Sequence, residues 1–151
     1  HPEAEFRALG AIGWQNRSAI PKDQIDAWID EGTITYLGTA EDVRDHLAAA
    51  DCVVLPSYRE GSPRTLIEAA AMARPVIATD VTGCRDVVDP GVSALLCEPR
   101  DAKSLAARMI EFLESSEEAR KAMGDAGRNK MEREYDEAIV IREYRGELRK
   151  K

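Results

Sequence analysis

The residues of this chain best suited to chemistry are two glutamates, Glu60 and Glu68, in one short segment. Between them, Gly61 allows the backbone to approach a ligand closely or to adopt a positive φ. Ser62 and Pro63 predict the start of a helix, because serine can cap the first amides and proline lacks the N–H that would be unpaired there. The segment therefore predicts a glycine turn and a helix N-terminus beside a carboxylate.

A helix that starts at Pro63 leaves unpaired backbone amides near Arg64 and Thr65, of which Ser62 can cap the amide of Thr65. Such amides, together with the positive end of the helix dipole, point at an anion. The sequence therefore predicts a phosphate-binding site where a strand, a glycine turn and a helix meet.

Glu68 is the only acidic residue between Arg64 and Arg74, in a helix that is otherwise apolar almost all round. Such helices are usually buried, and burying an unpaired carboxylate costs on the order of several kcal/mol. Glu68 should therefore have hydrogen-bond donors, which ligand hydroxyls would supply. The alternatives are that Glu68 lies in solvent at the helix edge, or that it pairs with Arg64 four residues earlier.

The cysteines and histidines give no support to metal, disulfide or thiol chemistry. Cys52, Cys84 and Cys97 are widely spaced, without a CxxC pair or a disulfide framework. The only histidines, His1 and His46, cannot complete a closed zinc site. We expect Cys52 in the core; Cys84 follows a glycine, where exposure is possible, but nothing marks it as a nucleophile.

The composition is that of one folded domain: 151 residues, 44% hydrophobic and 32% charged. The net charge of −7 argues against a nucleic-acid partner. No apolar run approaches the ~18 residues needed to cross a bilayer, and no signal peptide pattern is visible. The sequence therefore predicts a cytoplasmic protein.

Strand and helix patterns alternate along the chain. Strands are predicted at 5–13, 33–37, 52–55, 75–79 and 92–97. Helices are predicted at 22–30, 41–50, 63–73, 101–114, 117–133 and 137–149. This order predicts an α/β fold, a Rossmann-like parallel sheet flanked by helices, with a helical C-terminus over 101–149. The chain opens just before what reads as a second strand, so we expect 1–151 to be a fragment whose first strand is missing.

Glu60 and Glu68 belong to a longer pattern, Glu60-Gly61-x-Pro63-x-x-x-x-Glu68-Ala69, followed by Ala73-Arg74-Pro75-Val76-Ile77-Ala78-Thr79. This pattern resembles the donor-domain signature of retaining glycosyltransferase family four, the glycosyl transferases group 1, which have the GT-B fold. Further counterparts lie at 36–38, 50–57 and 80–99, so the resemblance covers nearly the whole chain. The Pro-Arg after the glycine and the Gly-Cys-Arg turn are similar to those of members that build polysaccharides.

The resemblance implies a nucleotide-sugar-binding domain over 1–151 and a role for each residue of the motif. Glu60, the implied catalytic residue, would bond the hydroxyls of the donor sugar, and the backbone of Gly61, Ser62 and Pro63 would touch that sugar.

For the nucleotide, the resemblance implies that the amides near Arg64 and Thr65 bind the diphosphate and that Glu68 binds the ribose hydroxyls. The loop after Gly38 would lie near the base. Such enzymes need no metal or other cofactor, because the helix dipole and cationic side chains neutralise the leaving diphosphate.

The sequence departs from the family in two respects. It lacks the Gly-Arg and Lys-Gly cations that usually hold the diphosphate, and it lacks the N-terminal acceptor domain. We therefore expect the donor-binding half of an enzyme that transfers a sugar to a glycan or lipid-linked acceptor, inactive by itself. Relatives often act at the inner face of the membrane.

Two other interpretations remain open. The chain could be another nucleotide-binding module, such as a Rossmann dehydrogenase, although Gly10-Ala11-Ile12-Gly13 lacks the full dinucleotide fingerprint. It could also be a non-catalytic domain that keeps the fold without a ligand.

The C-terminal helices carry two apolar stripes. We expect the first, Leu105, Met109, Ile110 and Leu113, to face the sheet. The second consists of Ile141, Tyr144 and Leu148. The terminal helix of GT-B enzymes typically crosses onto the N-terminal domain, so we expect part of this stripe to be exposed or to contact a second copy of the chain.

Overall fold

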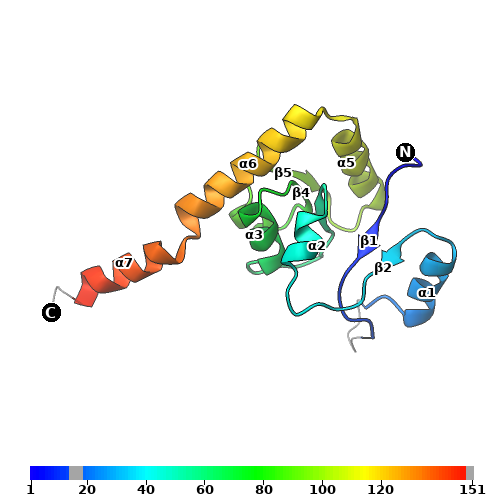
Figure 1. Ribbon diagram of the computed structural model, residues 1–151, viewed down its shortest axis with the longest axis horizontal. Coiled ribbons are helices and arrows are strands. Elements are labelled where there is room, and N and C mark those ends of the chain that lie inside the picture. The colour runs from blue at the N-terminus through cyan, green and yellow to red at the C-terminus, as the bar shows by residue number, and fades with distance from the viewer. Residues whose placement is uncertain (14–18, 149–151) are drawn as a thin grey trace. The chain divides into compact units, whose positions relative to one another are not determined.

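A computed structural model describes residues 1–13 and 19–148 of the chain. It divides into two units, residues 1–43 and 44–151, each described here by itself. Every strand pair in the described residues is parallel, and helices alternate with the strands (Figure 1). The predicted α/β class is therefore confirmed.

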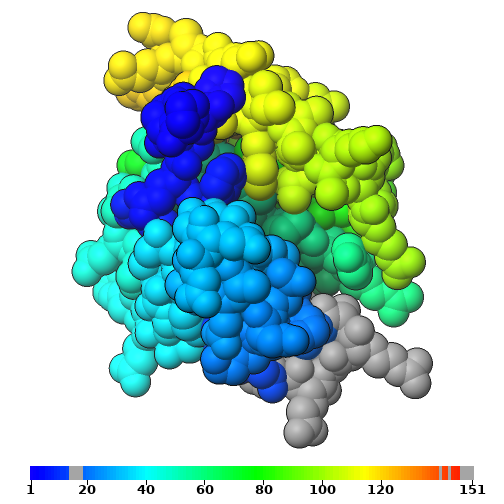
Figure 2. All heavy atoms as spheres, turned by 90° about the vertical axis from the view of Figure 1, so that its right-hand side faces the viewer, coloured from blue at the N-terminus to red at the C-terminus, as the bar shows by residue number. Residues whose placement is uncertain are grey.

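The first unit contains β1 (Arg7–Ala8), α1 (Lys22–Asp30) and β2 (Thr35–Tyr36). Its described residues run from dark blue to cyan in Figure 2, and none of the α1 residues is fully buried. The helix has the predicted bounds, but both strands are shorter than predicted. The segment 5–13 was expected as a strand that runs into a glycine turn, and Gly10 and Gly13 do adopt positive φ values of 145° and 90°, which leave the extended conformation.

The second unit contains a three-stranded parallel sheet and the remaining helices. Its elements are α2 (Arg44–Ala48), β3 (Val53–Leu55), α3 (Arg64–Ala71), β4 (Val76–Thr79), α4 (Thr82–Val87), β5 (Ala94–Cys97), α5 (Ala102–Glu114), α6 (Glu117–Glu134) and α7 (Glu137–Leu148). The strand order is β3-β4-β5, and all four residues of the central strand β4 are buried. The sequence did not predict α4, and β3 is only half-buried.

Helix α5 covers the sheet through part of the predicted stripe together with Phe112. Its Phe112 is buried against Ile77 of β4 and Leu95 of β5, and Leu105 and Met109 pack against this cluster as expected. Ile110 is exposed, contrary to the prediction. The periodicity located the helix but set its apolar face too wide, because positions 109 and 112 lie on the face of 105, at spacings of three and four, whereas 110 does not.

Helix α6 packs against the end of α3 through two glycines. A Cβ atom at Gly124 would lie 2.2 Å from the carbonyl oxygen of Ala73, and one at Gly127 would lie 3.4 Å from the Cβ of Ala70. The helices therefore approach more closely than larger side chains would permit.

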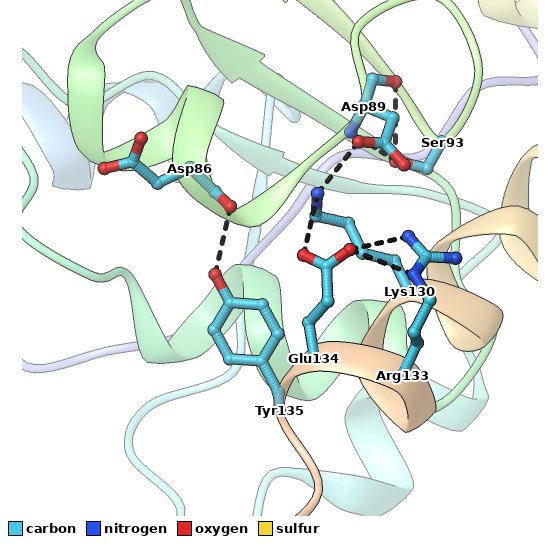
Figure 3. Close-up of polar contacts among 7 residues, drawn as sticks. All are labelled: Asp86, Asp89, Ser93, Lys130, Arg133, Glu134 and Tyr135. Carbon is cyan, nitrogen blue, oxygen red and sulfur yellow. Dashed lines mark hydrogen bonds and ion pairs between the residues drawn. The ribbon is translucent and has the colours of Figure 1, made fainter. Parts of the chain in front are cut away.

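The C-terminal end of α6 is fixed to the loop before β5 by a buried cation (Figure 3). Lys130 donates a hydrogen bond to Asp89 Oδ1 at 2.8 Å and lies 3.2 Å from Glu134 Oε2, and the hydroxyl of Tyr135 donates to the carbonyl of Asp86 at 3.0 Å. The bond to Asp89 raises the pKa of Lys130. The stabilisation that comes with this raised pKa is fully present at neutral pH and is lost as the pH rises through that pKa.

The apolar stripe of α7 is exposed where the structure describes it. The exposed fractions of Ile141 and Tyr144 are 47% and 71%, and the side chain of Leu148 lies outside the described residues. The expectation that part of this stripe is exposed is therefore confirmed.

Helix α4 packs under the loop that joins β3 to α3. A Cβ atom at Gly83 would lie 2.3 Å from the carbonyl oxygens of both Glu60 and Gly61. Two fixed backbone carbonyls cannot rotate away as the end of a flexible side chain can. The conformation of the Glu60–Gly61 loop therefore depends on the absence of a side chain at position 83.

We predict that Gly83→Ala destabilises the fold by about 1–3 kcal/mol through overpacking and displaces the Glu60–Gly61 backbone. Urea unfolding measures the first effect, and amide chemical shifts of residues 59–62 measure the second. Gly146→Ala is the matched control, because Gly146 is also helical but has no atom within 4 Å of its added Cβ. Equal stability of the two variants would contradict the prediction.

Candidate functional site

The candidate site lies where the three strands of the second unit end. Because β3, β4 and β5 are parallel, their carboxyl ends share one edge of the sheet. Loops 56–63, 80–81 and 98–101 follow at that edge, which is where open α/β sheets bind ligands. Of the predicted site residues, Glu60 to Thr65 and Glu68 belong to the first of these loops and to α3.

The N-terminus of α3 presents unpaired amides, as predicted. The amides of Leu66 and Ile67 both donate to the carbonyl of Pro63, at 3.0 and 3.2 Å. The amides of Arg64 and Thr65 donate to no other group in the described part of the chain. This end of the helix therefore has two free donors for an anion.

The predicted serine cap is absent. The helix begins at Arg64, so the buried Pro63 is the N-cap residue, and the cap makes no side-chain hydrogen bond. Ser62 is exposed. Because the helix starts one residue later than predicted, the serine lies outside the capping position, and the amide of Thr65 stays free.

Glu68 forms an ion pair with Arg64, in which Nη2 lies 3.2 Å from Oε1. The Glu68 side chain is 38% exposed and that of Arg64 is 89% exposed, so the expected buried carboxylate is not found. Of the alternatives drawn from the sequence, the pair with Arg64 is observed. An exposed pair at this spacing contributes only about 0.3–0.5 kcal/mol, so ligand hydroxyls can replace the guanidinium at little cost.

Glu60 is half-buried and Gly61 is exposed. Gly61 has no positive φ, and a Cβ built on it would meet no atom within 4 Å. The fold therefore does not require a glycine at position 61. The reason expected from the sequence, that a glycine lets a ligand approach the backbone closely, is the one that remains.

Cys84 lies in the core beneath this loop rather than at the surface. Burial, with a smaller contribution from the charge of Glu60, raises the pKa of its thiol to about 11. A buried, protonated thiol is a poor nucleophile. Burial likewise raises the pKa of Cys52, to about 12.

Two arginines at the edge of the sheet were not identified from the sequence as site residues. Arg85 Nε of α4 lies 3.3 Å from Asp80 Oδ1, and the guanidinium of Arg100 lies over the ring of Tyr58, 5.2 Å from its centroid. Arg85 belongs to the Gly-Cys-Arg pattern noted in the sequence, and the signal available for Arg100 was its place in the loop that follows β5.

Gly38, the remaining predicted site residue, belongs to the first unit. It follows β2, has a φ of 76°, and accepts a hydrogen bond from the amide of Gly10 at 2.8 Å.

Within residues 1–13 and 19–148, no group of three or more His, Cys, Asp or Glu side chains could hold a metal ion. In the same part of the chain, no helix combines the length and apolar character that a membrane crossing requires.

Comparison with known proteins gives a family match over residues 2–115, to the glycosyl transferases group 1. The chain is 28% identical over 117 residues to the N,N'-diacetylbacillosaminyl-diphospho-undecaprenol alpha-1,3-N-acetylgalactosaminyltransferase of Campylobacter jejuni, covering 78% of this chain and 31% of the relative. It is 46% identical over 70 residues to the putative teichuronic acid biosynthesis glycosyltransferase TuaC of Bacillus subtilis, covering 46% of this chain and 18% of the relative. The chain thus spans 18% to 31% of these relatives' length.

Solved structures show the same fold. A sucrose-phosphate synthase from Thermosynechococcus elongatus matches 96% of this chain and 39% of its own, with a TM-score of 0.79 and 27% identity. HepE of Anabaena, crystallised with UDP, matches 100% of this chain and 42% of its own, with a TM-score of 0.87 and 19% identity. These neighbours confirm the fold expected of a GT-B glycosyltransferase. Since the family match covers most of the chain, this protein belongs to the glycosyl transferases group 1.

Proposed function

We propose that this chain is the donor-binding half of a retaining glycosyltransferase, which transfers a sugar from a nucleotide-sugar to a glycan or a lipid-linked acceptor. One observation carries the proposal: two free amides, at Arg64 and Thr65, open a helix that has Glu60 before it and Glu68 one turn into it. This set of groups offers donors to an anion and acceptors to the hydroxyls on either side of it.

The diphosphate of the donor binds at the free amides. When the sugar leaves the donor, the bond between its anomeric carbon and the diphosphate oxygen breaks, and the electron pair stays on the diphosphate. Backbone donors already aimed at that oxygen stabilise the growing negative charge without a metal ion. The macrodipole of α3 acts in the same direction.

The two carboxylates recognise the two ends of the donor. Glu60, which precedes the helix, accepts hydrogen bonds from the transferring sugar, and the open face of Gly61 admits that sugar against the backbone. Glu68 exchanges its exposed partner Arg64 for the ribose hydroxyls. Hydrogen bonds to a charged carboxylate are each worth about 1.5–3 kcal/mol, more than the ion pair they replace.

The names of similar proteins support this assignment. Structures of HepE contain UDP or UDP-glucose, and one of TarM from S. aureus contains UDP. Curated relatives act in, or are assigned to, capsular polysaccharide, teichuronic acid and colanic acid synthesis. The Campylobacter relative is named for a diphospho-undecaprenol acceptor, which is a lipid-linked sugar.

The Glu68 carboxylate is the first group to test. We predict that Glu68→Ala weakens free-nucleotide binding about 100-fold, since two charge-assisted bonds are lost and ~1.4 kcal/mol corresponds to one decade. Glu68→Gln keeps one acceptor oxygen and should lose less. Isothermal titration with UDP and GDP measures both.

Arg64→Ala is the matched control for this test, because it removes the ion pair but leaves the carboxylate and the backbone amides. It should bind nucleotide as well as the parent does. If Glu68→Ala also binds as the parent does, the ribose role of Glu68 is wrong.

Glu60 should affect turnover more than nucleotide affinity, because it touches the transferring sugar rather than the nucleoside. We predict that Glu60→Ala in the complete transferase lowers kcat at least 100-fold, a loss of roughly 3 kcal/mol of transition-state stabilisation. The dissociation constant of the free nucleotide should change less than threefold. A variant with full turnover would contradict the assignment of Glu60.

A further inference from the structure

We propose that Arg100 is a positioning residue, which holds the loop carrying Glu60 in place through the ring of Tyr58. The role of Arg100 in turnover rests on the proposed function of that loop. The effect of Arg100 on the rigidity of the loop concerns only the described residues and can be tested without a substrate.

The loop from Pro56 to Ser62 has few fixed contacts of its own. Its residues neither donate nor accept a hydrogen bond with any other group in the described residues. Two of its contacts are with Gly83, which approaches the backbone of Glu60 and Gly61, and with Arg100, whose guanidinium lies 5.2 Å from the centroid of the Tyr58 ring. The ring of Tyr58 thus joins this loop to the loop that follows β5.

The loop that carries Arg100, residues 98–101, is held in place by hydrogen bonds. On one side of Arg100, the amide of Glu98 donates to Ser104 Oγ at 2.9 Å. On the other side, Asp101 Oδ1 accepts the amides of Lys103 and Ser104 at 2.9 and 3.0 Å and caps α5. The backbone of Arg100 is thus held from both directions, while the loop that carries Tyr58 is not. The contact between Tyr58 and Arg100 therefore joins the Pro56–Ser62 loop, which has no hydrogen bonds of its own among the described residues, to a loop that hydrogen bonds hold in place.

Arg100 adopts a backbone conformation that favours glycine. Its φ is 61°, in the left-handed region, where a residue with a Cβ is strained. Glycine would adopt this φ without strain. We therefore attribute the presence of an arginine at this position to an interaction of its side chain. That side chain makes the contact with Tyr58.

Glu60 lies two residues after Tyr58, so movement of the ring is transmitted to the carboxylate. The free amides of Arg64 and Thr65 lie beyond the buried Pro63, on the helix itself. Loss of the contact should therefore disturb the group next to the sugar and leave the nucleotide-binding groups in place.

The test compares Arg100→Gly with three variants by ¹⁵N relaxation of the chain. Arg100→Gly removes the guanidinium and the strain together, so it should not lower the Tm. We expect the order parameters of residues 58–61 to fall from about 0.85 to below about 0.6. Arg100→Lys and Tyr58→Phe keep a cation and a ring and should retain the rigid loop. Ala73→Gly relieves the same kind of strain, at a φ of 54°, without touching this loop, and should change nothing there.

In the complete transferase, Arg100→Gly should lower kcat about two- to fivefold, the factor that corresponds to an exposed cation–π contact. The dissociation constant of the free nucleotide should not change, and Arg100→Lys should restore turnover. Unchanged order parameters in Arg100→Gly would overturn the positioning role. If the parent chain binds no nucleotide, the proposed function fails instead, and the relaxation data still decide the role of Arg100.

Discussion

The site depends on one constraint, the burial of β4 between two parallel neighbours. All four residues of this strand are buried, and their register aligns Leu55 with Ala78 and Thr79 with Cys97. The loops that leave β3, β4 and β5 must therefore emerge at the same edge. This places the Glu60 loop, the α4 helix and the Arg100 loop within reach of one another, although they come from separate parts of the sequence.

Most of the recognition proposed at this edge is made by the backbone. The two free amides depend on the conformation of the loop before α3. The open face at Gly61 and the close approach of Gly83 depend on small residues rather than on particular side chains. The ion pair between Arg64 and Glu68 is exposed and contributes little to stability. Such a pair is suited to exchanging partners when a ligand arrives, whereas the buried Lys130 is suited to holding the end of α6 against the loop before β5.

The sequence predicted the parts of the structure that follow from local patterns. The helices α1, α5, α6 and α7 were located closely, since their periodicity is sustained over many residues. The start of α3 was one residue in error, because Ser62 and Pro63 each fit a helix start and only packing decides between them. The contact between Tyr58 and Arg100 had no local signal at all. It joins two loops distant in sequence and requires a left-handed arginine, which no pattern of hydrophobicity predicts.

Titration of UDP into the ¹⁵N-labelled chain tests the central claim most directly, because it reports on individual amides. If the N-terminus of α3 binds the diphosphate, the amides of Arg64 and Thr65 should show the largest saturable shifts, as expected for groups that gain a charge-assisted hydrogen bond. NAD at the same concentration should not reproduce this pattern. Saturable binding of UDP that leaves these two amides unshifted, or no binding at all, would contradict the account.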